Sequence, residues 1–174
     1  MVEYDEHPSK ASALRDGRLV VLPDAEAEDC TVWFSAERAS SGSVKWEGLL
    51  ARRLGPDRAR LCAIPFWLYD LNLGDEVEVL DSAEGAPVAA RLMRDAGNFT
   101  FRVRREGSDG DDWRRGLMVD LERFECWFDV RSSGFLALSA PSVHAEAVAN
   151  YLHAREQQGD LQFETGRTRQ PDGS

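Results

Sequence analysis

Residues 60–80 read RLCAIPFWLYDLNLGDEVEVL, and they indicate the architecture of the chain most directly. Residues 71–76 separate an apolar run at 63–69 from an alternating Val77-Glu78-Val79, which is typical of a half-buried strand. Gly74 can adopt a left-handed backbone conformation that other residues avoid, and the Asp75 carboxylate can accept hydrogen bonds from backbone N–H groups of the turn. We therefore expect a tight turn at this point that leads directly into a strand.

The composition is that of an ordinary globular protein. The chain has 174 residues, of which 43% are hydrophobic and 30% charged, enough for one domain or for two small ones that share an interface. No apolar run approaches the roughly 20 residues of a membrane helix, and the N-terminal sequence MVEYDEHPSK is too acidic for a secretory signal. We expect a cytoplasmic protein with no membrane partner.

Cysteine usage agrees with that compartment. Cys30, Cys62 and Cys126 are odd in number and widely spaced, and no C-x-x-C occurs, so we expect three buried or half-buried thiols. The formal net charge of −10 argues against nucleic acid or anionic membranes as main partners, because binding to phosphates requires clustered positive charge. It is compatible with a basic protein partner, and equally with plain solubility.

The first half of the chain predicts strands and almost no helix. Residues 1–27 are acidic and lack a clear period, and within them only residues 18–23 could form a short strand, so we expect a flexible arm. Residues 28–96 form a predicted β-rich, partly open barrel-like half. Its expected strands lie at 31–34, 45–54, 58–63, 76–81 and 88–93, and turn-forming residues such as those at 39–43, 55–57 and 82–87 separate several of them.

The second half, residues 97–166, predicts the order β-α-β-β-α-β. The expected strands are 98–104, 126–130, 135–139 and 161–164; helical spacing of apolar residues recurs over 113–121 and 143–152, and the acid-rich residues 108–112 suit a helix start. This order is the ferredoxin-like pattern, in which two helices cover one face of a four-stranded sheet. The fold class is therefore α+β, with a disordered tail at residues 167–174.

These motifs resemble a bacterial family of uncharacterised domains. The family carries a Glu-Leu-Trp-Ala-like strand, an Asn-x-Pro-Phe segment and a Gly-Asp-x-Val turn. The matching residues are Glu47 with Leu49-Leu50-Ala51, then Ile64-Pro65-Phe66, then Gly74-Asp75-Glu76-Val77, and the resemblance covers roughly residues 30–166. Leu50 and Ala63 stand where the family has tryptophan and asparagine. The family implies a fold but no activity. Residues 71–79 also resemble the Gly-Asp box of cradle-loop barrels.

Signatures of catalysis and cofactor binding are missing from the sequence. His144 and His153 are nine residues apart, which fits no zinc motif, and the acids Asp109, Asp111 and Asp112 lack the order of a calcium loop. No G-x-S-x-G, G-x-G-x-x-G or G-x-x-x-x-G-K occurs, so we expect no cofactor and favour a non-enzymatic role. Phe99 and Phe101 could stack on RNA bases, but they more simply face the predicted helices.

Two functional hypotheses remain from the sequence. The first is a protein-binding module, in its specific form an acidic immunity protein that neutralises a basic bacterial toxin. The second is an enzyme or small-ligand protein with a pocket between the two halves. The candidate site residues are Trp67, Tyr69, Asp70, Asp75, Glu146 and Glu156: the first four surround the central turn, and the two glutamates lie on the last predicted helix.

Overall fold

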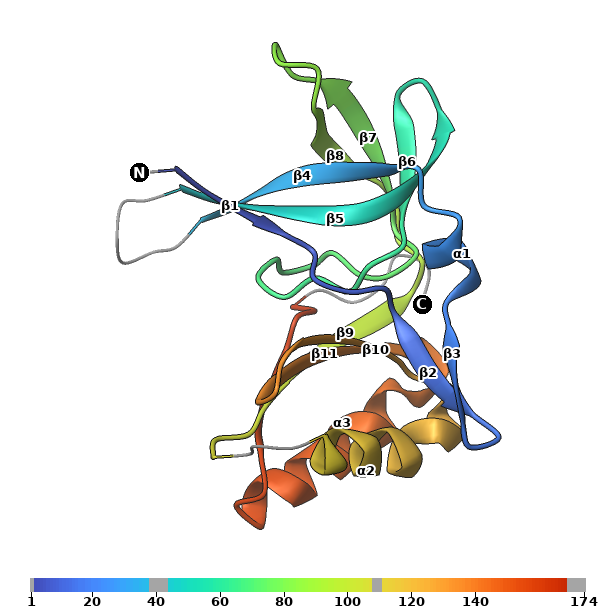
Figure 1. Ribbon diagram of the computed structural model, residues 1–174, viewed down its shortest axis with the longest axis vertical. Helices are drawn as coiled ribbons and strands as arrows, with labels where there is room; N and C mark the ends of the chain where they lie inside the picture. Colours follow the sequence, from blue (N-terminus) through green and yellow to red (C-terminus); the bar gives the residue numbers. More distant parts are fainter. Residues whose placement is uncertain (1, 38–43, 108–110, 169–174) are drawn as a thin grey trace.

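The computed structural model describes residues 2–37, 44–107 and 111–168 and shows a strand-rich α+β protein. Two six-stranded sheets lie one above the other, and the two longer helices cover the lower sheet from below (Figure 1). The expected break at 39–43, most of the acidic segment 108–112 and most of the tail 167–174 lie outside the described residues.

The upper sheet is a small barrel. Its strands follow the order β1 (Val2–Glu6), β5 (Val44–Gly55), β4 (Cys30–Glu37), β8 (Pro87–Arg94), β7 (Glu76–Asp81) and β6 (Arg58–Leu61). An additional pairing of β5 with β6 closes the five strands β4–β8 on themselves, and β1 extends the sheet beside β5. Small and branched side chains fill the interior, among them Val32, Ala51, Ala59, Val77 and Val79, which the alternation of these strands turns inward.

The lower sheet follows the order β12 (Gln162–Thr165), β9 (Asn98–Arg104), β11 (Phe135–Pro141), β10 (Trp127–Ser132), β2 (Ser12–Arg15) and β3 (Arg18–Val21). Helices α2 (Asp112–Leu121) and α3 (Ser142–Gln157) cover one face of it, and α1 (Pro23–Glu26) and the 3-10 turn η1 (Glu122–Phe124) are short. As expected, Phe101 packs in the core beneath this sheet, with Val103, Leu138 and Leu152. Arg102, the residue between two inward positions of β9, points to the opposite face.

The N-terminal residues are not a flexible arm, and the structure corrects that prediction. Val2–Glu6 pairs in parallel with β5, from Val2 opposite Val44 to Glu6 opposite Gly48. Ser12–Arg15 and Arg18–Val21 form a hairpin whose first strand adds to β10 in the other sheet. The segment therefore ties the two sheets together. The polar sequence hid this role: β1 and β3 are edge strands whose side chains are mostly exposed, and the buried side chains of β2 are limited to Ala13 and Leu14.

Residues 62–75 lie between the barrel and the lower sheet. Ile64, Phe66 and Leu73 from this segment pack with Phe135 and Ala137 of β11 in a third apolar cluster, separate from the barrel interior and from the helix-covered core. The central turn is formed as expected. Gly74 has φ +84°, and its N–H donates to the Leu61 carbonyl oxygen at 2.9 Å.

Several other expectations are confirmed. The strand predicted at 76–81 and the strand predicted at 98–104 have these bounds in the structure. Cys62 and Cys126 are buried and Cys30 is half-buried, each as a free thiol. Among the described residues, none of the helices has the length and apolar character needed to cross a membrane.

Candidate functional site

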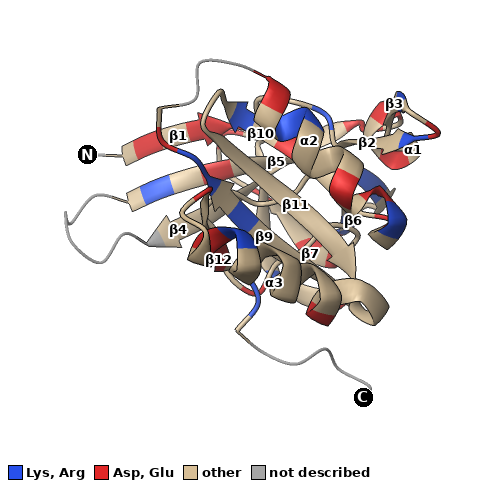
Figure 2. Ribbon diagram, turned by 90° about the horizontal axis from the view of Figure 1, so that it is seen from below, with Lys and Arg blue, Asp and Glu red and all other residues tan. Residues whose placement is uncertain are grey.

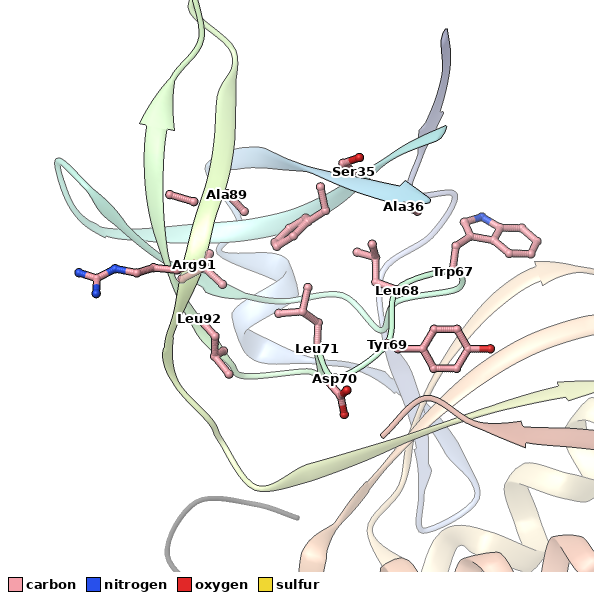
Figure 3. Close-up of a pocket in the computed structure, with 13 residues that line it drawn as sticks. Ser35, Ala36, Trp67, Leu68, Tyr69, Asp70, Leu71, Ala89, Arg91 and Leu92 are labelled. Atoms are coloured by element: carbon pink, nitrogen blue, oxygen red, sulfur yellow. The ribbon is translucent and has the colours of Figure 1, made fainter. Parts of the chain in front are cut away.

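A groove opens in the barrel wall where strands β4 and β8 separate. The two strands run parallel but pair at one position, Trp33 opposite Val88. Beyond this pair the strands part, and a groove of about 460 Å³ lies between Phe34–Ala36 of β4, Ala89–Leu92 of β8 and the loop Trp67–Leu71 (Figure 3). Three candidate residues from the sequence, Trp67, Tyr69 and Asp70, line this groove.

The floor of the groove is apolar and its rim is polar. Phe34, Leu68 and Val77 are buried residues of the barrel core that reach the floor. Ser35 and Arg91 lie at the rim, and Arg91 projects away from the barrel in Figure 3. Its guanidinium Nε donates to Glu78 at 2.7 Å. The floor is thus made of barrel-core side chains, of which Val77 is fully buried and Phe34 and Leu68 are each 6% exposed.

A buried carboxylate from the barrel holds the loop that forms one wall. Glu47 points inward from β5 and accepts hydrogen bonds from the backbone N–H groups of Phe66 at 2.7 Å and Trp67 at 3.0 Å. Burial raises the pKa of Glu47, although both hydrogen bonds favour the ionised form. The contact fixes the start of the loop, so the groove wall is pre-formed.

The Trp67 side chain is also fixed, by charged partners from three strands. Its indole Nε1 donates to the Asp5 carboxylate at 2.7 Å, and Asp5 also binds Lys45 at 3.0 Å and Arg131 at 2.7 Å. Burial raises the pKa of Asp5, but the hydrogen bonds from these three donors together hold it below its usual value. The Lys45 ammonium lies 4.2 Å from the centre of the Trp67 ring.

Tyr69 and Asp70 differ in how freely they can meet a ligand. Tyr69 is 52% exposed; the Arg102 guanidinium lies 4.6 Å from its ring centre, and its hydroxyl donates to Glu164 at 3.2 Å. Asp70 has φ +56°, and its carboxylate accepts from both the backbone N–H, at 2.7 Å, and the hydroxyl of Thr168. The Tyr69 ring therefore points away from Leu71 and Leu92 of the groove (Figure 3), and Asp70 secures the C-terminal segment.

The structure places the other three candidate residues outside the groove. Asp75 is fully buried and accepts from the backbone N–H groups of Asn72, at 2.9 Å, and Ala96, at 2.8 Å. Burial raises its pKa to about 6 despite these bonds. Glu146 and Glu156 lie on α3, on the far side of the lower sheet, where Glu156 accepts from the Phe163 N–H. Asp75 is a structural residue of the turn, as the Gly-Asp pattern predicts.

Two residues that join the sheets, Asp129 and Arg102, were not among the candidates from the sequence. Asp129 of β10 is fully buried and accepts from the Ile64 N–H at 2.8 Å, and His7 Nε2 lies 3.0 Å from the same carboxylate. Arg102 of β9 donates to the carbonyl oxygens of Pro65 and Leu68 and to Glu164. The sequence signal that could have identified them is a charged residue between two apolar residues of a strand, as in Phe128-Asp129-Val130.

Few ionisable side chains line the groove. Besides the already paired Arg91 and Asp70, Tyr69 is the remaining titratable residue that lines it. Within residues 2–37, 44–107 and 111–168, no group of three or more histidine, cysteine or acidic side chains is arranged to hold a metal ion.

The fold and the site define a two-sheet α+β domain with a groove in its barrel, and comparison with known proteins places the chain in a family. It belongs to the family described as Domain of unknown function (DUF4265), whose model matches residues 47–163. A hypothetical protein from Neisseria gonorrhoeae has a similar crystal structure, with a TM-score of 0.67 at 15% identity over 79% of this chain and 94% of that one. At this identity the likeness concerns the fold alone. No curated protein matches the sequence.

Proposed function

We propose that the protein is a binding module that accepts an extended segment of another protein in the groove between β4 and β8. The observation that carries this proposal is the separation of the two strands after the single pair Trp33–Val88. Beyond it, β4 pairs on its other side with β5, and β8 pairs with β7. Within the described residues, no strand pairs with the sides of Phe34–Ala36 and Ala89–Leu92 that face the groove.

Such a site suits an extended peptide. A strand that binds to an open sheet edge gains affinity from main-chain hydrogen bonds and specificity from pockets for alternate side chains. The apolar floor at Phe34 and Leu68 can receive one set of side chains, and Ser35 and Arg91 lie at the rim. Because Glu47 already holds the loop, binding would cost little conformational entropy in the loop.

The specific form of the proposal is an immunity protein that neutralises a basic toxin. It is supported by the net charge of −10, which favours association with a basic partner. Figure 2 shows acidic and basic positions interspersed over the helices and strands of that view. Long-range attraction would therefore arise from the whole molecule, with Glu146 and Glu156 as contributors, while the groove would provide the close contacts.

We also propose that residues 97–166 are a ferredoxin-like unit extended by the N-terminal hairpin. The order β12-β9-β11-β10, with antiparallel neighbours throughout and both helices on one face, supports this classification. Strands β2 and β3 then lengthen the sheet beyond β10. The groove lies in the barrel, so the proposed binding does not depend on this assignment.

A block of the groove tests the proposed function. Ala90 is exposed on β8 and lines the groove, so Ala90→Arg should place a long charged side chain across it without disturbing the core. Proteins captured from the source cell by the unmodified chain would be identified, and their binding kinetics measured with both forms. We expect at least about tenfold weaker binding through faster dissociation. Ala147→Arg, on an exposed position of α3, is the matched control and should bind normally.

Salt dependence tests the basic nature of the partner. Between about 50 and 300 mM salt the screening length falls from roughly 14 to 6 Å, so an electrostatically steered on-rate should fall steeply.

Equal binding by Ala90→Arg and the unmodified protein would exclude the groove as the contact surface. A tightly held small molecule in place of a protein partner would favour the small-ligand hypothesis, which the volume of the groove also permits.

A further inference from the structure

A second cleft lies on the outer surface of the barrel and is lined by aromatic rings. It measures about 480 Å³ and is bounded by Tyr4 of β1, Trp46 of β5, Trp33 of β4 and the turn Ser82–Ala86 that joins β7 to β8. Tyr4 is 65% exposed, and both tryptophans are half-buried. The three rings thus come from three adjacent strands and meet on one face of the sheet.

Strand register explains why the rings gather. Tyr4 is the β1 partner of Trp46, and across the next pair of strands Trp33 is the partner of Gly48. A Cβ atom on Gly48 would lie 2.8 Å from the Thr31 side chain and 2.9 Å from the Trp33 ring. Glycine at this position therefore lets the Trp33 indole lie directly against β5. The Tyr4 ring stands perpendicular to the Trp33 ring, with ring centroids 5.5 Å apart and an interplanar angle of 89°.

The turn adds one carboxylate to the aromatic walls. Internal hydrogen bonds shape it, with the Ser82 N–H donating to the Ala86 carbonyl oxygen and the Ala86 N–H donating to Ser82 Oγ. Glu84 at its tip is exposed, and in the described part of the chain it makes no ion pair. No lysine or arginine lines the cleft. Its charge is therefore complementary to a cation.

The polar atoms of the rings are also unused. Trp67 and Trp113 each donate a hydrogen bond from the indole nitrogen, to Asp5 and to the Ser133 carbonyl oxygen. Among the described residues, Trp33 and Trp46 show no such bond. Two half-buried rings therefore lie at the surface without the protein acceptor that the indole nitrogens of Trp67 and Trp113 have, and their exposed apolar area is available to a ligand.

We propose that this cleft binds an alkylated ammonium group, such as a quaternary ammonium. Perpendicular aromatic faces attract a cation through the negative potential above each ring, and tryptophan is the strongest of the three ring types. A primary ammonium brings three N–H donors that need acceptors, whereas Glu84 is the one carboxylate that lines the cleft. A quaternary ammonium needs no hydrogen bond and presents methyl groups to the rings. The proposal is independent of peptide binding in the groove.

The test compares a cation with its neutral isostere. Choline and 3,3-dimethylbutan-1-ol have nearly the same shape, but only choline is charged. The indole N–H signals of the ¹⁵N-labelled full chain would be followed by NMR during titration with each probe, after assignment with Trp33→Phe and Trp46→Phe. We expect choline to shift the Trp33 and Trp46 signals saturably, to leave those of Trp67 and Trp113 in place, and to bind about tenfold more tightly than the alcohol.

Variants distinguish binding of choline in the aromatic cleft from non-specific binding. Tyr4→Leu and Glu84→Gln should each weaken choline binding several-fold, whereas Tyr4→Phe keeps the ring and should bind choline normally. Glu106→Gln removes the same charge from an exposed turn after β9 and serves as the control. Equal affinity for the two probes, no saturable shift up to about 100 mM choline, or unchanged binding by Tyr4→Leu would each overturn the proposal.

Further titrations identify the source of the cation. A short peptide that carries trimethyl-lysine, the same peptide with unmodified lysine, and free choline would be compared by the same signals. Tighter binding of the trimethylated peptide indicates a modified protein as the ligand, and tighter binding of choline indicates a small metabolite or a lipid headgroup. Tighter binding of the unmodified lysine peptide than of either methylated probe would contradict the proposal, because the site is argued to prefer a group without N–H donors.

Discussion

The carboxylate of Asp129 on β10 and the backbone N–H of Ile64 are joined by a hydrogen bond of 2.8 Å that links the lower sheet to the segment beneath the barrel. His7, which follows β1, approaches the same carboxylate at 3.0 Å. Three parts of the chain far apart in sequence thus meet at one buried acid. The relative position of the two sheets, and with it the loop that lines the groove, depends on contacts of this kind.

Removal of this acid should therefore be costly. Asp129→Ala leaves the Ile64 N–H buried without an acceptor and removes the partner of His7, so we expect the free energy of unfolding to fall by about 3 kcal/mol. Urea denaturation of the variant measures this change. Asp81→Ala is the control, because Asp81 is exposed and its contact with Arg53 is 3.4 Å long, so its loss should cost less than about 1 kcal/mol. Similar costs for both variants would contradict the role assigned to Asp129.

The N-terminal strand should be required for stability. Deletion of residues 1–7 removes β1, the Asp5 carboxylate that holds Trp67, and the buried His7. A loss of about 3 kcal/mol or more corresponds to a fall in Tm of roughly 10 °C for a chain of this length. Thermal unfolding followed by circular dichroism measures the shift. An unchanged Tm would restore the flexible arm that the polar sequence suggests.

The turn at Gly74 should not tolerate a side chain. At φ +84° any other residue is strained, and a Cβ would lie 3.1 Å from that of Ala96. Gly74→Ala should destabilise the fold by more than about 1 kcal/mol. Gly85 has φ +81° with open space around its position, so Gly85→Ala isolates the backbone cost and should destabilise less. Equal losses would show that contact with Ala96 contributes nothing.

Asp75 should make stability fall as the pH rises from about 4 to 6. Burial raises its pKa in the folded protein to about 6, above the value of about 3.9 for an unfolded chain. The folded state therefore binds the proton more tightly, and the contribution of Asp75 to stability is greatest below pH 4 and lost as the pH passes 6. Asp75→Asn should flatten this part of the stability profile, measured by denaturation between pH 3.5 and 7. An unchanged slope would assign the proton to another group, such as Glu47, whose pKa burial also raises.

Local sequence patterns were sufficient for most of the strands and for the central turn. The alternation at 76–81 and 98–104 and the Gly-Asp pair report interactions between near neighbours, and these were correctly interpreted. Of the six candidate residues, Trp67, Tyr69 and Asp70 border the groove, and their binding role stays a prediction.

The pairing of distant strands could be seen only in the folded molecule. Nothing in Val2–Glu6 or Ser12–Arg15 reveals that one joins the barrel and the other the lower sheet, since edge pairing depends on backbone hydrogen bonds that every sequence can form. The same applies to the groove and to the aromatic cleft. Both result from where β4 meets β8 and β5, and side chains such as Tyr4 and Trp33, 29 positions apart, become neighbours only through that register.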